Sequence, residues 1–323
     1  MMRALQQTSF NGPRDMRLID DAPVPIPTRG EILIRVAAAG LNFADVARAH
    51  GTFLNGPEPP FLAGFEAAGQ VVQLGEGVTA PQLDAWVVGV GAGAFAEYMP
   101  LRAGAAVPVP SGWSAEQALG LTVNWPTALA ALKPMGRIAA GETVLIHAAA
   151  GATGQAAVVM AKHYGATVIA TASPSKHETA RRVGADYVLD SRSPDLAAQV
   201  LKLSGGLGAD LVLECAGGTT FEATTAKRVT GRVVVFGAAG GKATLSNWEL
   251  VYKHPLQIVG LNIGVLVQSA PQIFGQVMAE LGALIAEGVL TATRPMVYDL
   301  ADGATLLAQL ESRRTVGKLA LRP

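Results

Sequence analysis

A glycine turn between an apolar run and a helical run has the clearest chemical meaning in this chain. Residues 143–154 read Thr-Val-Leu-Ile-His-Ala-Ala-Ala-Gly-Ala-Thr-Gly. Gly151 and Gly154 take the second and third positions of the pattern G-x-G-x-x-G, and Ala149 takes the first. The second glycine lets the backbone approach a pyrophosphate, and the third lets the helix pack on the strand. An ordinary strand–helix turn is the alternative, but the elements that follow favour a dinucleotide site at a helix N-terminus.

The segment after the next predicted strand, 167–171, bears on the choice between NADPH and NADH. An NAD-specific site usually places Asp or Glu here to hold the ribose 2′-hydroxyl, yet no acid occurs before Glu178. Ser173 and Lys176 offer a hydroxyl and a positive charge for a 2′-phosphate instead. Alternatively, Ser173 caps a helix that Pro174 opens and Lys176 is solvated; both can hold, since a helix start is itself an anion site. The sequence favours NADPH.

Short apolar strands alternate with helical stretches from about residue 119 to 257. Such alternation is typical of βαβ units and a parallel sheet. One helix is expected over 154–164, with Gly165 as its left-handed cap. The strands are expected at 143–147, 167–171, 187–189, 211–214, 233–236 and 257–261. The predicted fold class is therefore α/β, with a Rossmann, doubly wound parallel sheet.

The flanking parts of the chain have a different pattern. Residues 1–118 read as short strands, such as 31–37 and 69–74, separated by Pro and Gly. One long helix is expected over 271–288, followed by a β-like tail. The pattern predicts a β-rich substrate domain formed by 1–118 and 258–323, into which a nucleotide-binding domain, 119–257, is inserted.

Composition excludes several classes of function. The chain has 323 residues with 25 basic and 25 acidic side chains, a balance that does not favour binding to nucleic acid or to an anionic membrane. No apolar run is long enough to span a membrane, and the first residues lack the apolar core of a signal peptide, so we expect a cytoplasmic protein. Cys215 is the single cysteine, which excludes an intrachain disulfide and a cysteine-rich zinc site.

Several segments, taken in order, resemble the zinc-independent quinone oxidoreductase branch of the medium-chain dehydrogenase/reductase family, the zeta-crystallin-like proteins. The resemblance covers essentially the whole chain and implies a GroES-like substrate domain beside the Rossmann domain. The segments are GLNFAD (40–45), PFLAGFEAAG (60–69), NWPTA (124–128), HAAAGATG (147–154), SPSK (173–176), GAD (184–186), GRVVVFG (231–237) and GK (317–318).

The resemblance also implies roles for individual residues. Asn42 and Thr127 would line the nicotinamide pocket and take part in catalysis. The family usually forms homodimers through the sheet edges of the nucleotide domains, and its small-molecule electron acceptor is reduced by NADPH. Further cofactor contacts are expected from Asn124, Ala150, Gly151, Ala152, Thr153, Gly154, Ser173, Lys176, Ser191, Cys215, Ala216, Phe236, Gly237, Ala238 and Lys318.

The chain departs from the family pattern at informative positions. Zinc-dependent relatives carry a ligand histidine in Gly-His-Glu, where this chain has Phe65 between Gly64 and Glu66. Phenylalanine cannot coordinate zinc, so no metal is expected. Ala47 and Phe53 stand where quinone reductases often carry tyrosines, and Ser191 replaces a tyrosine beside the cofactor phosphate.

Without zinc to stabilise an oxyanion, the acceptor must delocalise the incoming charge itself, as a quinone or an activated alkene does. We therefore expect hydride transfer from NADPH to such an acceptor in a cleft between the domains. Asn42 is expected beside the substrate carbonyl or the carboxamide; its alternative role is a turn or cap before Asp45. The proton comes from solvent or from His50, the one nearby imidazole. An apolar wall, or plain core, is expected from Phe43, Phe53, Phe61 and Phe65.

Two other functions are compatible with parts of the pattern. Within enzymes, the second candidate is an NADPH-dependent reductase of enones or 2-enoyl thioesters. From a different class, the chain could be a non-catalytic NADPH-binding structural or sensor protein, since the tyrosines are missing. RNA binding has little support because the chain has no basic excess.

Overall fold

The computed structural model describes residues 1–218, 221, 231–253 and 256–323. The chain divides into two compact units, one formed by Met1–Val123 with Ala292–Pro323 and the other by Asn124–Thr291. The second unit thus ends later than the sequence boundary at 257/258. The reason is packing: the helices α9 (Ile263–Ser269) and α10 (Pro271–Ala286) lie against α3 (Asn124–Ala130), which belongs to the second unit.

A six-stranded sheet forms the centre of the second unit, in the order β11-β10-β9-β12-β13-β14. All five neighbouring pairs are parallel, which confirms the predicted Rossmann sheet. Each strand begins and ends within one residue of its predicted position. The strands are β9 (Thr143–Ile146), β10 (Thr167–Ala172), β11 (Tyr187–Asp190), β12 (Leu211–Glu214), β13 (Arg232–Val235) and β14 (Gln257–Gly260).

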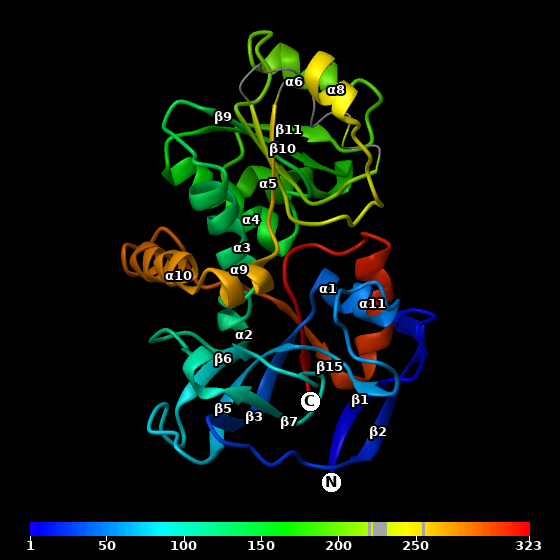
Figure 1. Cartoon of the computed structure of the whole chain (residues 1–323), viewed down its shortest axis with the longest axis vertical. Helices are drawn as coiled ribbons and strands as arrows, with labels where there is room; N and C mark the ends of the chain where they lie inside the picture. The colour runs from blue at the N-terminus through cyan, green and yellow to red at the C-terminus, as the bar shows by residue number, and fades with distance from the viewer. Residues whose placement is uncertain (219–220, 222–230, 254–255) are drawn as a thin grey trace. The chain divides into compact units, whose positions relative to one another are not determined.

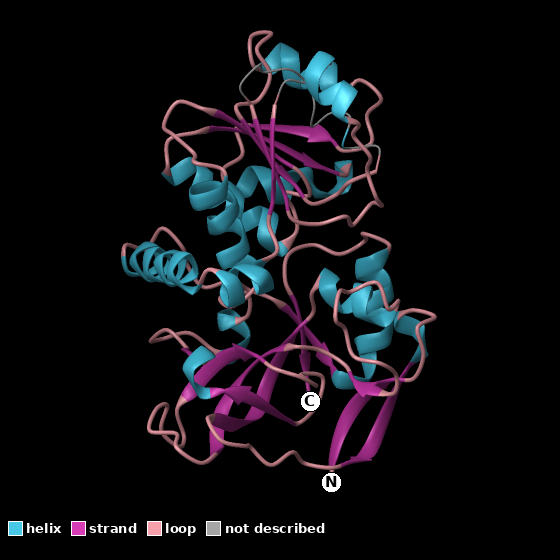
Figure 2. Ribbon diagram, viewed as in Figure 1, coloured by secondary structure: helices cyan, strands magenta, loops and turns pink. Residues whose placement is uncertain are grey.

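Helices cover both sides of this sheet (Figure 2). Alternate side chains of a strand point to opposite faces, so each strand contributes to two layers of core. On one face Leu145, Ile169 and Val212 pack with Leu196 and Val200 of α6. The described helical segments of this unit are α3, a π turn (Ala131–Met135), α4 (Ala152–His163), a 3₁₀ turn (Pro174–Lys176), α5 (His177–Arg182), α6 (Leu196–Leu203), α8 (Asn247–Tyr252), α9 and α10.

The first unit contains two sheets, one of three strands in the order β2-β1-β4 and one of seven strands. The larger sheet runs β15-β16-β3-β5-β6-β8, with β7 paired to β3. The elements of the first unit are β1 (Met2–Gln7), β2 (Met16–Ala22), β3 (Glu31–Gly40), α1 (Phe43–Ala49), β4 (Phe61–Leu62), β5 (Glu66–Leu74), β6 (Trp86–Val90), β7 (Tyr98–Arg102), β8 (Val107–Pro108), α2 (Ala115–Ala118), β15 (Met296–Asp299), α11 (Gly303–Glu311), β16 (Leu319–Arg322) and 3₁₀ turns at Pro13–Asp15, Ala103–Ala105 and Leu300–Asp302.

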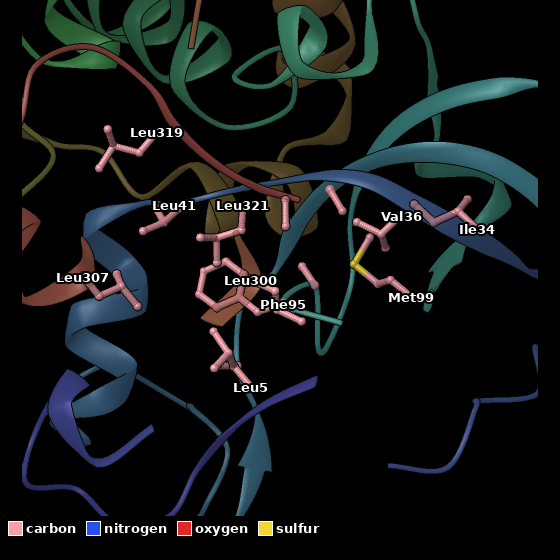
Figure 3. Close-up of a cluster of buried hydrophobic side chains, with 14 of the residues drawn as sticks. Leu5, Ile34, Val36, Leu41, Phe95, Met99, Leu300, Leu307, Leu319 and Leu321 are labelled. Atoms are coloured by element: carbon pink, nitrogen blue, oxygen red, sulfur yellow. The ribbon is translucent and has the colours of Figure 1, made fainter. Parts of the chain in front are cut away.

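The two ends of the chain share the core of the first unit (Figures 1 and 3). Phe95 is fully buried in a cluster with Leu5, Leu307 and Leu321. Strand β16 lies antiparallel to β3, with Leu321 opposite Ala39. This register places the residue just before β16, Lys318, next to the end of β3, where the candidate site begins.

Candidate active site

The glycine turn has the geometry that its sequence predicts. Helix α4 begins at Ala152 directly after Gly151, and its first turn leaves backbone N–H groups without partners inside the helix. A Cβ added at Gly154 would lie 2.4 Å from the carbonyl oxygen of Ala148 and 2.6 Å from the Cα of Ala149. Only glycine therefore lets α4 pack this closely on the turn. The cradle has the shape and the N–H donors that a pyrophosphate needs.

Helix α3 brings two further predicted residues to this turn. The Asn124 side-chain nitrogen Nδ2 donates a hydrogen bond of 3.2 Å to Oγ1 of Thr153. Thr127 follows one turn later on the same helix and is partly exposed. The N-terminus of α3 thus lies against the N-terminus of α4, as a shared nucleotide site requires.

The predicted 2′-phosphate residues lie at the carboxyl end of β10. Pro174 opens a 3₁₀ turn at its first position, and Ser173 precedes it without a side-chain cap hydrogen bond. The hydroxyl of Ser173 is thus not used as a helix cap, whereas Lys176 closes the same turn. The N–H of Ser191 donates to the carbonyl of Ala172 at 3.0 Å, so the turn after β11 lies beside Ser173.

The remaining predicted cofactor contacts of the second unit come from two adjacent turns. The N–H of Phe236 donates to the carbonyl of Glu214 at 2.9 Å, and the N–H of Ala239 donates to the carbonyl of Cys215 at 3.0 Å. A Cβ on Gly237 would lie 2.9 Å from that same Cys215 oxygen. The segments 215–216 and 236–238 therefore lie side by side at the carboxyl ends of β12 and β13. Burial raises the pKa of Cys215 to about 12, so its thiol is not a nucleophile.

A buried polar cluster behind these turns was not predicted from the sequence. His147 and Glu214, at the ends of β9 and β12, are both fully buried, with 3.6 Å between Nε2 and Oε2. Glu214 Oε1 accepts hydrogen bonds from the N–H groups of Ala216 at 2.6 Å and Gly217 at 2.7 Å, and so fixes the turn after β12. Burial lowers the pKa of His147, whose Nδ1 lies 3.0 Å from the hydroxyl of Thr171. The signal in the sequence was a polar residue at the end of each apolar strand.

In the first unit, Asn42 lies in a network with Glu66 and Lys318. Lys318 Nζ is 2.5 Å from Glu66 Oε2 and 2.9 Å from Asn42 Oδ1. Asn42 Nδ2 donates to Glu66 Oε2 at 2.9 Å and to the carbonyl of Gly40 at 3.2 Å. The other Glu66 oxygen accepts from the N–H of Gly120 at 2.7 Å. The network fixes the rotamer of Asn42 and leaves its amide plane with one defined orientation.

Asn42 also precedes α1, which agrees with the alternative role predicted for it. Its backbone N–H donates to Oδ2 of Asp45 at 2.9 Å. Asp45 is buried, and its other oxygen has no hydrogen-bond partner in the described part of the chain. Burial raises the pKa of Asp45 to about 7, although the Asn42 N–H and the nearby Arg48 and Lys318 charges oppose this shift. Asn42 is therefore both a helix start and a member of the polar network.

Phe65 occupies the position where zinc-dependent relatives carry a histidine. It is 7% exposed and starts the segment that leads into β5. The guanidinium of Arg48 lies over the Phe65 ring at 4.6 Å and over the Phe53 ring at 5.0 Å. In the described part of the chain, no three His, Cys, Asp or Glu side chains are grouped to hold a metal ion. The residues at this position do not fit a zinc site.

The other aromatic and imidazole candidates lie in different surroundings. Phe43 is half-buried and packs on the core of the first unit. Phe61 is in β4, opposite Gln7 of β1. His50 Nε2 lies 2.6 Å from Oε1 of Glu311 on α11, so this imidazole is held by a carboxylate. Of the four predicted wall residues, the structure brings together only Phe53 and Phe65, through Arg48.

Comparison with known proteins identifies the class of this fold and site. The family described as "Alcohol dehydrogenase GroES-like domain" matches residues 28–111, and the family described as "Zinc-binding dehydrogenase" matches residues 152–281. Among curated proteins, a phenolphthiocerol/phthiocerol polyketide synthase subunit of Mycobacterium tuberculosis is 32% identical over 91% of this chain, which spans 14% of that protein. The human synaptic vesicle membrane protein VAT-1 homolog is 30% identical over 100% of this chain and 87% of its own length.

Solved structures are similar over the whole chain. A mycobacterial protein in complex with NADPH is 32% identical, with 100% of both chains covered and a TM-score of 0.93. The Escherichia coli quinone oxidoreductase in complex with NADPH is 29% identical, with 99% and 100% covered and a TM-score of 0.90. CurK enoyl reductase is also 29% identical, with 99% of each chain covered and a TM-score of 0.89. The chain belongs to the medium-chain dehydrogenase/reductase family of oxidoreductases, with quinone oxidoreductases among its relatives.

Proposed function

We propose that this protein transfers hydride from NADPH to a quinone or another electron-poor acceptor, without a metal ion. The observation that carries the proposal is the Asn42–Glu66–Lys318 network next to Phe65. Phe65 stands in place of a metal ligand, and the Asn42 amide nearby is held in a fixed orientation. The first unit therefore offers a hydrogen-bonding group and no metal ion as a Lewis acid. Two similar structures are described as NADPH complexes, which supports the choice of cofactor.

NADPH, when bound, supplies the hydride, and the residues of this chain supply its position. The N–H groups at the start of α4 would hold the pyrophosphate, with no side chain at Gly151 to obstruct it. Ser173 and Lys176 would hold the 2′-phosphate. Thr127 and Asn42 would contact the nicotinamide end. Both amide hydrogens of Asn42 are donated to Glu66 and Gly40, so its contact would be made by Oδ1, which can accept a hydrogen bond from the carboxamide. Without a metal ion to stabilise a full oxyanion, the acceptor would delocalise the charge itself.

Steady-state oxidation of NADPH against a panel of quinones and enones tests this function. We expect turnover of quinones that survives dialysis against a zinc chelator and is not increased by added zinc. Loss of activity on chelation, restored by zinc, would contradict the metal-free part. Tight NADPH binding with no turnover of any acceptor would contradict the enzymatic part.

A reductase of enones or 2-enoyl thioesters is the second candidate. The observation in its favour is the similarity to CurK enoyl reductase and to polyketide synthase segments. The same hydride chemistry applies, because an enone carries the incoming charge as an enolate. The ratio of kcat/KM for a quinone to that for a matched enone decides between the two. A non-catalytic NADPH-binding role is the outcome if neither compound is turned over.

We also propose a homodimer, formed along the β14 edge of the six-stranded sheet. Strand β14 ends the sheet, and its residue Ile258 is exposed. Helix α8, which precedes β14 in the chain, exposes Trp248, Val251 and Tyr252. An unpaired strand edge with exposed apolar side chains nearby is a usual place for association.

Across the described residues, no helix has both the length and the apolar character needed to cross a membrane.

A further inference from the structure

A hollow of about 380 Å³ lies in the first unit, beside the end of α1. Its lining consists of Phe10, Arg48 and the segment 51–58, all within the first unit. The segment follows directly from α1, whose first residue is next to Asn42 in the chain. Helix α1 therefore connects Asn42, at its start, with Arg48 of the hollow, in its last turn.

Arg48 is the basic group of this hollow, and its guanidinium contacts two aromatic rings. Its guanidinium lies between two aromatic rings, 5.0 Å from the centre of Phe53 and 4.6 Å from the centre of Phe65. Stacking of this kind fixes the plane of a guanidinium and partly removes it from water. Its Nε is buried and has no hydrogen-bond partner in the described part of the chain. A fixed charge with an unused donor is unusual for arginine, which normally pairs when buried.

Asp45 is the acidic group that interacts electrostatically with Arg48, and it compensates the Arg48 charge only in part. Among the described residues, no carboxylate oxygen lies within the 4.0 Å of its guanidinium nitrogens that defines an ion pair. Asp45, one helical turn before it, is buried, and burial raises its pKa to about 7, so it carries at most part of a negative charge near neutral pH. Glu58 lines the hollow but is exposed to water, which screens its charge.

We propose that Arg48 binds an anionic oxygen group, a carboxylate or a phosphate, carried by the electron acceptor. This inference rests on the proposed function and adds the substrate class to it. A planar guanidinium matches the geometry of a carboxylate or phosphate and can bond to it through two nitrogens.

The helix sets the distance between the anionic group and the reacting part of the acceptor. Arg48 lies six positions after Asn42 in the chain, which corresponds to roughly 9 Å along the helix axis. An acceptor that reaches both would carry its carboxylate or phosphate on a side chain several bonds away from the electron-poor carbonyl. Simple unsubstituted quinones would then be turned over, but with a higher KM.

A pair of acceptors that differ only in charge tests the proposal. We suggest a benzoquinone whose alkyl side chain ends in a carboxylate, and its methyl ester; the same quinone with a terminal phosphate distinguishes the two anions. Wild-type protein is expected to have a KM for the better anion about tenfold below that for the ester. Arg48→Met, which keeps an apolar stem between the rings, should remove this difference by raising the KM for the anion to that for the ester. Arg48→Lys should restore part of the preference.

Arg29→Met provides a matched control, because Arg29 is an exposed arginine of the same unit. It should leave both KM values unchanged. Equal KM values for acid and ester in the wild type, or a parallel change of both in Arg48→Met, would overturn the proposal. If no quinone is turned over, the proposed function fails separately, and calorimetric titration with acid and ester then decides the Arg48 proposal. Binding of the acid that Arg48→Met does not weaken would overturn it.

Discussion

At the scale of single residues, the contact between Lys318 and Glu66 is the strongest constraint on the candidate site. Both side chains are almost completely excluded from solvent, at 3% and 0% exposure. Removing one partner of a buried ion pair leaves an uncompensated charge, which typically costs about 3–5 kcal/mol. We therefore expect Lys318→Met to lower the free energy of unfolding by about this amount, as measured by urea denaturation. The Asn42 amide loses its Lys318 contact in the same variant, so activity should fall as well.

The double variant Lys318→Met/Glu66→Gln separates the charge effect from the loss of packing. With no unpaired charge left, it should recover a large part of the lost stability without recovering activity. Additive losses of stability in the two single variants and the double variant would show that the two groups do not interact in the folded state.

Asp45 predicts a pH dependence of stability. Burial raises its pKa to about 7 in the folded protein, from an ordinary value of 3.8. Between pH 3.8 and about pH 7 the Asp45 carboxyl group is ionised in the unfolded chain and protonated in the folded protein. The free energy of unfolding therefore falls as the pH rises through this range. We expect the wild type to lose up to about 4 kcal/mol relative to Asp45→Asn between pH 4 and pH 7, with little further change above pH 7.

Urea denaturation at a series of pH values measures this difference. Asp20→Asn is the control, because Asp20 is an exposed carboxylate of β2 in the same unit. Its stability difference from the wild type should stay nearly constant with pH. A gain of stability in the wild type relative to Asp45→Asn over this range would mean that Asp45 is ionised in the folded state.

Gly154 tests the packing of the phosphate turn. The Cβ of an alanine there would lie 2.4 Å from a backbone oxygen, so α4 must move away from the turn. We expect Gly154→Ala to destabilise the protein by about 1–3 kcal/mol and to weaken NADPH binding at least tenfold. Gly275→Ala is the control, since an added Cβ in this part of α10 meets nothing within 4 Å. It should be neutral or slightly stabilising, because alanine is the better helix former. Equal effects in the two variants would contradict the packing argument.

Residue types and spacing predicted the glycine turn but not the contacts that depend on distant segments. Gly151 and Gly154 could be assigned because their roles follow from a local pattern. The contact of Lys318 with Glu66 joins positions 252 apart in the sequence, and it exists because β16 pairs with β3. The position of Arg48 between Phe53 and Phe65 likewise depends on the path of the segment after α1.

At the scale of elements, the end of β10 should decide between the two nicotinamide cofactors. Ser173 and Lys176 lie in one tight turn, in which the N–H of Lys176 donates to the carbonyl of Ser173 at 2.8 Å. Replacing the lysine removes a charge that would contact the 2′-phosphate of NADPH, a group that NADH lacks. We expect Lys176→Met to raise the Kd for NADPH about tenfold and to leave the Kd for NADH unchanged, as measured by fluorescence titration.

Lys202→Met serves as the control, because Lys202 is an exposed lysine on α6 of the same unit. It should leave both dissociation constants unchanged. Tighter binding of NADH than of NADPH by the wild type would overturn the assignment of the cofactor, whatever the variants do.

Strand positions were predictable from the sequence because buried parallel strands are short apolar runs between turns. The partner of a helix was not, because an apolar stripe shows that a helix will be buried but not against what. Helix α10 was therefore assigned to the substrate domain, whereas it packs on α3 in the unit that contains the parallel sheet.

At the scale of the whole molecule, the proposed homodimer follows from the free edge at β14. The charge of the chain is balanced, with 25 acidic and 25 basic residues, so no net repulsion opposes the association of two copies. Sedimentation analysis over a range of concentrations should show a dimer for the wild type. Ile258→Lys places a charge on the exposed edge strand and should shift the equilibrium to monomers with the fold intact. Ile26→Lys, which alters an exposed apolar side chain of the first unit, should sediment like the wild type. A wild-type monomer at every concentration would exclude this interface, and a dimer that Ile258→Lys leaves intact would place the interface elsewhere.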